Sequence, residues 1–154
     1  MNKIYSTTIA IVIAVIIAAT AWSCSDDDKN DGPVSYEQLP MAAKTFLTEY
    51  YGGIPVVNVR SEGKDNSLET TVTLKNGHEI EFNSMGEWND VEAPAGDVIP
   101  FAIIPEPIQA YLVATYPDQG VREISRGYNG YEVKLANGLE LKFSPSGEYT
   151  GIDR

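Results

Sequence analysis

Residues 133–149 read "VKLANGLELKFSPSGEY", and residues 72–88 read "VTLKNGHEIEFNSMGEW". Both stretches place an Asn-Gly dipeptide between two runs of alternating apolar and polar residues. Asn-Gly is the strongest short hairpin signal, because both central residues of the tight turn take positive φ. The alternation is typical of strands with one buried and one solvated face. The sequence therefore predicts the same antiparallel hairpin twice.

The similarity between the two copies continues toward the N-terminus. Upstream of "EGKDNS" the matching residues are 65 positions apart, and downstream they are 61 apart, so the second copy lacks four residues of a loop. Hairpin loops tolerate such changes because closure entropy grows slowly with length. The matches include Leu39 with Ile104, Pro40 with Pro105, Phe46 with Tyr111, Tyr51 with Tyr116, Val59 with Ile124, Phe82 with Phe143 and Gly86-Glu87 with Gly147-Glu148. The sequence therefore indicates an internal duplication of one structural unit.

Each copy begins as a helix and continues as strands. Pro40 and Pro105 suit the first helical position, and apolar residues follow each of them at helical spacing. The strand segments of the first copy are "VVNVRS", "LETTVTLK", "HEIEF" and a run from Glu87. Those of the second are "VREISRG", "YEVKL", "LELKF" and a run from Glu148. Each unit is therefore expected to be one helix followed by four antiparallel strands.

The predicted fold class is α+β, with two tandem helix-plus-four-stranded antiparallel sheet units. One unit of about 50 residues buries too little surface to be stable by itself. We therefore expect the two units to share one eight-stranded sheet with both helices on one face. The expected boundaries are a first repeat at 36–92, a linker at 93–103 and a second repeat at 104–154.

The N-terminal region is predicted to be an export signal. Lys3 precedes an apolar run of about 16 residues, which is short for a membrane-spanning helix. The sequence "AWSC" resembles the lipobox of bacterial lipoproteins, so we expect cleavage of residues 1–23 and acylation of Cys24. The alternative is an ordinary secreted protein with a free cysteine. Residues 24–35 are acidic and predicted to be a flexible tether, and they resemble the acidic signal that sends some lipoproteins to the surface of Gram-negative bacteria.

The doubled pattern "LP…FL…YY…V.LKNGHEIEF…GEW" and "IP…YL…YPDQGVREI…GYEVKLANGLELKF…GEY" resembles the PepSY-like family, also described as β-lactamase-inhibitor-like. The resemblance covers roughly residues 39 to 153. It implies the tandem helix-plus-sheet fold and a bacterial envelope lipoprotein. The repeats contain no cysteine for the disulfides of the secreted β-lactamase inhibitor protein, so inhibition of β-lactamase itself is not expected.

Composition argues against several classes of function. The formal net charge of −11 disfavours nucleic acid, whose binders carry basic patches. One cysteine and one histidine leave few ligands for a metal, and no cofactor is expected. His78 aligns with Leu139 and shares strand parity with Ile80, so it is expected to be structural rather than catalytic. The glutamates that alternate with apolar residues are expected to be exposed, with ordinary pKa values.

The predicted site is the sheet face that the helices leave open. Its candidate partner-binding residues are Thr71, Thr73, Glu79, Glu81, Glu132, Lys134, Glu140 and Lys142, with the aromatic residues Trp88, Tyr128 and Tyr149 at its margins. The alternative is a merely solvated face, with Trp88 and Tyr149 packed on the core.

The sequence thus predicts a non-catalytic lipoprotein that binds a protein, with inhibition of an exported hydrolase such as a protease as one form of that activity. A surface lipoprotein that binds a small ligand or glycan is the alternative, and an enzyme is the third hypothesis. The expected location is the cell envelope, with a lipid anchor in the outer membrane on its surface-exposed or periplasmic side.

Overall fold

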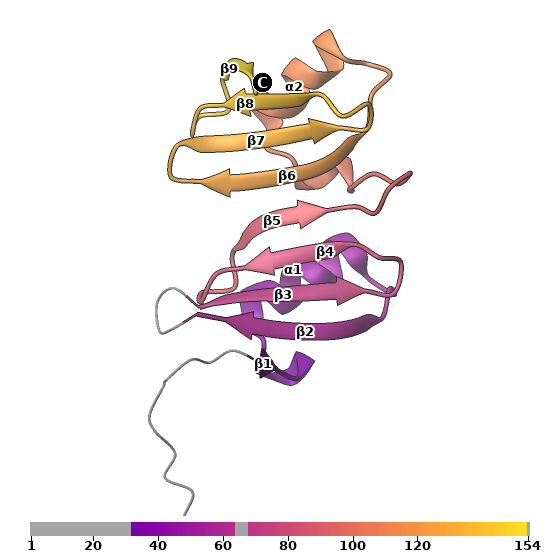
Figure 1. The fold of residues 1–154 in the computed structure, drawn as a ribbon, viewed down its shortest axis with the longest axis vertical. Helices are drawn as coiled ribbons and strands as arrows, with labels where there is room; N and C mark the ends of the chain where they lie inside the picture. Colours follow the sequence, from indigo (N-terminus) through magenta and orange to yellow (C-terminus); the bar gives the residue numbers. More distant parts are fainter. Residues whose placement is uncertain (1–31, 64–67, 154) are drawn as a thin grey trace, which may run out of the picture.

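The structure is a computed structural model that describes residues 32–63 and 68–153. The predicted signal peptide, the acylation at Cys24 and most of the predicted tether lie outside the described residues. Within them, the chain forms one antiparallel sheet with two helices packed on the same face (Figure 1).

The sheet is a meander in which every strand pairs with its neighbours in the sequence. Its order is β1-β2-β3-β4-β5-β6-β7-β8-β9, and every pairing is antiparallel. The bounds are β1 Gly32–Pro33, β2 Val56–Glu62, β3 Glu69–Leu74, β4 Glu79–Phe82, β5 Trp88–Glu92, β6 Val121–Gly127, β7 Gly130–Leu135, β8 Glu140–Phe143 and β9 Tyr149–Ile152.

Each unit has one α-helix, preceded by a short 3-10 helix. Helix α1 is Met41–Tyr51 and α2 is Glu106–Thr115, while the 3-10 helices are η1 Tyr36–Gln38 and η3 Phe101–Ile103. Pro40 and Pro105 occupy the N-cap, one position before the predicted place. Each has an extended ψ, near 149° and 140°, so the helical conformation begins only at the next residue.

The predicted α+β fold is confirmed, because all eight expected strands share one sheet and both helices cover the same face. The structure adds a ninth, two-residue strand at the edge of the sheet. This strand, β1, pairs Gly32 with Ser61 and Pro33 with Arg60, and the Val34 N–H donates to the carbonyl of Val59. The end of the segment predicted as a flexible tether is therefore held against β2.

One hydrophobic core lies between the sheet and the helices and runs through both units. In each unit an aromatic residue of the helix meets a buried phenylalanine edge-on, with Phe46 against Phe82 and Tyr111 against Phe143. At the seam, Val91 of β5 lies opposite Ile124 of β6, and neither is exposed. The predicted linker also contributes to the core through its buried residues Ala93, Ile99 and Ile103.

Both predicted hairpins form, but their loops have three residues and not the two of the predicted turn. The Gly77 N–H donates to the Leu74 carbonyl and the Gly138 N–H donates to the Leu135 carbonyl, so each glycine follows the two central residues of its turn. Gly77 and Gly138 both have φ of 87°. Left-handed φ is strained for residues with a β-carbon, so glycine is favoured at both turns. The turns set the register in which Val72 faces Ile80 and Val133 faces Leu141.

Candidate protein-binding face

The side of the sheet away from the two helices, here called the open face, carries two cross-strand rows of polar residues. The strand register places one row at Arg60, Thr71, Glu81, Asp90, Ser125, Glu132 and Lys142. The second row is Asn58, Thr73, Glu79, Glu92, Glu123, Lys134 and Glu140. The structure thus brings together the eight strand residues that the sequence analysis proposed for this face.

The second unit's part of the open face has paired charges. Lys134 pairs with Glu140, and the Lys142 Nζ lies 3.6 Å from Glu132 and 3.0 Å from Asp153. The hydrogen bond that Lys134 donates to Glu140 raises the pKa of Lys134, and the hydrogen bond that Lys142 donates to Asp153 raises the pKa of Lys142. Both lysines therefore stay cationic, and this end of the face mixes both signs of charge.

The centre of the open face is acidic. Glu81, Asp90, Glu92 and Glu123 lie on three neighbouring strands, and Arg122 reaches Glu92 at 3.5 Å and Glu123 at 3.8 Å. Partial burial raises the pKa of Asp90 to about 7, with repulsion from Glu123, Glu81 and Glu92 adding to the effect. Within the part of the chain that the structure describes, the Asp90 carboxylate has no hydrogen bond or ion pair.

Glu81 departs from the expectation of an ordinary pKa. Its pKa is raised, first by partial burial and then by the negative charges of Glu69 and Glu62. The expectation treated the alternating glutamates as fully solvated, but neighbours on adjacent strands remove part of the water around Glu81. That environment is a property of the assembled sheet.

The three aromatic candidates do not lie together. Tyr128 is 99% exposed at the β6–β7 turn. Trp88 and Tyr149 instead lie on the helix side, because a register shift in each pairing sets them opposite the buried Phe82 and Phe143. The Arg126 guanidinium covers the Trp88 ring at 5.0 Å, and Tyr149 stacks on Tyr111 at 4.6 Å. Neither Trp88 nor Tyr149 is part of the open face.

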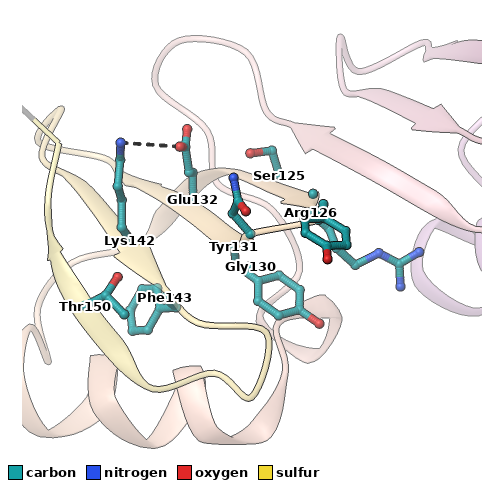
Figure 2. A pocket seen from close by; sticks show the side chains of 11 residues that line it. Ser125, Arg126, Gly130, Tyr131, Glu132, Lys142, Phe143 and Thr150 are labelled. Atoms are coloured by element: carbon teal, nitrogen blue, oxygen red, sulfur yellow. Dashed lines mark ion pairs between the residues drawn. The ribbon is translucent and has the colours of Figure 1, made fainter.

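A shallow depression of about 540 Å³ lies at the β6–β7 end of the sheet (Figure 2). The residues labelled there include Arg126, Tyr131, Glu132 and Lys142, with Glu132 and Lys142 joined as an ion pair. Tyr128 also lines the depression, so it combines aromatic rings with both signs of charge. That combination suits a polar ligand with a flat apolar side.

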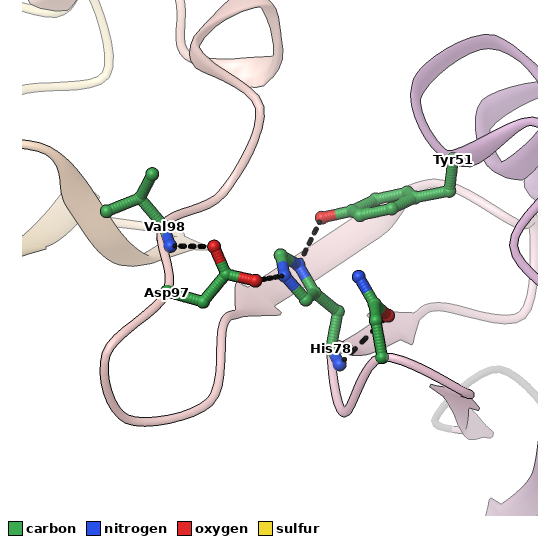
Figure 3. Close-up of polar contacts among 5 residues, drawn as sticks. Tyr51, His78, Asp97 and Val98 are labelled. Carbon is green, nitrogen blue, oxygen red and sulfur yellow. Dashed lines mark hydrogen bonds and ion pairs between the residues drawn. The ribbon is translucent and has the colours of Figure 1, made fainter.

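His78 is buried, at 3% exposure, and both ring nitrogens have partners (Figure 3). Nδ1 lies 3.3 Å from the Tyr51 hydroxyl, and Nε2 lies 3.1 Å from Asp97 Oδ2. Hydrogen bonding to His78 lowers the pKa of Asp97, while burial raises that of Tyr51 far above its usual value. The contacts join the β3–β4 turn to α1 and to the segment between the units, which is a structural arrangement.

Sequence reasoning missed four polar residues at the centre of the face, although the signal was present. Asp90 and Glu92 flank the buried Val91, and Glu123 and Ser125 flank the buried Ile124. This is the same alternation that identified the hairpin residues. It extends over too few positions in these strands to stand out.

No group of three or more His, Cys, Asp or Glu side chains in 32–63 and 68–153 is placed to hold a metal ion. None of the helices in those ranges is long and apolar enough to cross a membrane.

The sequence and the fold both have similar counterparts among known proteins. The family model described as "Putative beta-lactamase-inhibitor-like, PepSY-like" matches residues 68–150. The chain belongs to the PepSY-like family. The family resemblance inferred from the repeated pattern is therefore confirmed, and no curated protein matches the chain.

Solved structures from Bacteroides are similar over nearly their full length. A "putative calcium-regulated periplasmic protein" from Bacteroides thetaiotaomicron is 34% identical with a TM-score of 0.74, covering 80% of this chain and 97% of its own. A periplasmic protein of the DUF2874 family from Bacteroides vulgatus is 32% identical with a TM-score of 0.75, covering 84% and 99%. Another from that species, of unknown function, is 30% identical with a TM-score of 0.75, covering 80% and 99%. These PepSY-like neighbours fit an envelope or periplasmic location.

Proposed function

We propose that this PepSY-like protein is a non-catalytic envelope lipoprotein whose open face binds a protein partner, and that one form of this activity is inhibition of an exported hydrolase. The observation that carries the proposal is the open face itself. Two polar rows cross β2 to β8 without a helix over them. The family's description as inhibitor-like supports the same class of function.

The charges on the open face indicate the chemistry of the partner. Asp90 lies at the seam of the two units with acidic neighbours and with a pKa raised to about 7. A lysine or arginine of a partner placed opposite Asp90 would favour the ionised carboxylate and lower its pKa. At neutral pH binding would then release protons, and the partner surface would be basic at its centre and mixed in charge toward Lys142.

The first step of the test is to capture the partner from the native envelope, with the chain lacking residues 1–23 as bait. Glu81→Lys and Lys142→Glu reverse charges on the open face, and we expect each to weaken binding about tenfold or more with little change in Tm. Glu49→Lys on α1 and Lys75→Glu at the β3–β4 turn are matched controls, since both residues are exposed and lie outside the two rows. Equal losses from the controls would contradict a site on the open face.

If the partner is a hydrolase, its rate in the presence of increasing amounts of the protein tests inhibition directly. We expect the rate to fall to a plateau at equimolar protein, and the open-face variants to shift the titration to higher concentration. A partner that binds with no change in rate would limit the proposal to binding.

The depression beside Tyr128 supports a second candidate, the binding of a small ligand or glycan. Aromatic rings next to hydrogen-bonding charges can hold the apolar face and the hydroxyls of a sugar. A glycan array would test this candidate. Binding that disappears in Tyr128→Ala but persists in Glu81→Lys would favour it over the protein-binding proposal.

We further propose attachment to the outer membrane through acylated Cys24, based on "AWSC" and on the apolar run before it. Several acyl chains anchor a protein stably, since each buried methylene contributes about 0.8 kcal/mol. Mass spectrometry of the mature N-terminus is expected to show Cys24 as a lipid-modified first residue. An unmodified Cys24 in a correctly cleaved protein would contradict the anchor.

A further inference from the structure

The outer edge of β9 is open to solvent. In the described residues no strand pairs with this edge. The Asp153 N–H donates to the Glu140 carbonyl on the β8 side, so the alternation of an antiparallel ladder directs the N–H and C=O of Ile152 outward. The Ile152 side chain is 46% exposed. The edge thus offers both backbone hydrogen bonds and an apolar contact.

The duplication shows what such an edge accepts, because β5 is the equivalent of β9 in the first unit. At the spacing of the repeat, Glu87 corresponds to Glu148, Trp88 to Tyr149, Val91 to Ile152 and Glu92 to Asp153. Strand β5 is covered on this side by β6, which pairs with it antiparallel. The β5–β6 pair is therefore a template within the same molecule for the pairing of β9.

Three side chains of β6 contact β5 or the residues next to it. The buried Ile124 lies directly opposite Val91. Arg126 lies 3.7 Å from the Glu87 carboxylate and covers the Trp88 ring at 5.0 Å. At the other end, Arg122 lies 3.5 Å from Glu92. The strand that fits this edge therefore has an aliphatic residue between two basic ones, in the order "REISR".

Each residue of the first unit that contacts β6 in this way has a chemically similar counterpart at β9. Ile152 replaces Val91 as the apolar centre. Glu148 and Tyr149 replace the carboxylate and the aromatic ring, although Tyr149 leans on Tyr111 of α2. Asp153 replaces Glu92 and already pairs with Lys142 at 3.0 Å, so Glu148 supplies the main charge for an incoming arginine.

We propose that β9 accepts an extended segment of another polypeptide, paired antiparallel, in which basic residues stand two positions before and two after an aliphatic residue. Strand addition of this kind gains affinity from main-chain hydrogen bonds and specificity from alternate side chains. This surface is distinct from the open face, so the proposal does not depend on the function proposed there.

A second copy of this chain fits the edge poorly. Its strand equivalent to β6 is β2, which has Val57 and Ser61 where β6 has Arg122 and Arg126. The outer edge of β2 is also occupied by β1. The formal net charge of −11 further opposes association of two copies and favours a basic segment.

The test uses the full chain and a fluorescent peptide of residues 120–128, "GVREISRGY", as the probe. We expect saturable binding in fluorescence anisotropy and slower exchange of the Ile152 amide hydrogen. Ile152→Lys should weaken binding about tenfold or more, because it replaces the apolar centre with a charge that repels the arginines. Val57→Lys makes the same change at an exposed valine of β2, and binding should not change.

Four results would overturn the proposal. The first is no binding of the peptide at millimolar concentration, and the second is equal binding by Ile152→Lys and the unsubstituted protein. The third is equal binding of a peptide with both arginines changed to glutamate. The fourth is a dimer in analytical ultracentrifugation that Ile152→Lys abolishes, which would identify a second copy as the occupant. Loss of peptide binding in Ile152→Lys but not in Glu81→Lys would separate this edge from the open face.

Discussion

Asp90→Asn is expected to stabilise the protein at alkaline pH and to leave it unchanged in acid. Asp90 sits on β5, at the seam of the two units, among the carboxylates of Glu81, Glu92 and Glu123. Burial and these neighbours disfavour its ionised form. Asparagine keeps the shape of the side chain and removes the charge.

The magnitude follows from the pKa of Asp90 in the folded and unfolded chain. Folding raises that pKa from 3.8 to about 7. When the pKa of an acid is higher in the folded chain than in the unfolded chain, the folded state is favoured most at a pH below the unfolded pKa. This stabilisation is lost as the pH rises to the folded pKa, because the acid must then ionise in an unfavourable environment. The complete loss would be about 4 kcal/mol. Solvent reaches part of this side chain, so we expect Asp90→Asn to gain about 2 kcal/mol at pH 8.

The measurement is urea unfolding of both proteins between pH 3.5 and 8, with the range chosen to span the two pKa values. The quantity compared is the difference in unfolding free energy between variant and parent at each pH, since other groups also titrate. It should be near zero at the acid end and should rise through the interval. A gain of about 2 kcal/mol corresponds to roughly 6 °C in Tm.

Asp118→Asn is the matched control, because Asp118 is an exposed aspartate in the turn after α2. We expect its effect to stay within about 0.5 kcal/mol at every pH. The reasoning would be refuted if Asp90→Asn gave the same difference at both ends of the pH range, or if it destabilised the protein at pH 8.

Two further changes test the core. His78→Leu copies Leu139 of the second unit, but it leaves the buried Tyr51 hydroxyl without its hydrogen-bond partner. In urea unfolding, the free energy of unfolding should fall by about 1 to 2 kcal/mol, and adding Tyr51→Phe should restore it. Binding at the open face should not change. Loss of that binding in the folded variant would instead justify a search for chemistry around His78. Ile124→Ala should lower the free energy of unfolding by about 3 kcal/mol, because Ile124 is buried at the seam opposite Val91. Calorimetry should still show one unfolding transition, since the core crosses the seam, and residues 36–92 alone should not fold. Two transitions would show that the units unfold independently.

Much of the fold could be predicted from local patterns. The Asn-Gly turns require left-handed backbone at Gly77 and Gly138, and the alternation beside them assigns each hairpin residue to one face. The repeat then extends that assignment from one unit to the other. These signals lie within a few consecutive residues, so they can be read without knowing any long-range contact.

The tertiary structure decided what depends on neighbouring strands. Register shifts place Trp88 and Tyr149 on the helix side, and a single inserted residue in a strand reverses the face that alternation predicts. Asp90 has a raised pKa because the strands on both sides partly bury it and also bring carboxylates next to it. Likewise, Val91 and Ile152 hold equivalent positions in the two repeats, yet only Val91 is buried. The reason is that β6 covers the edge of β5, which contains Val91, whereas β9, which contains Ile152, is the last strand of the sheet.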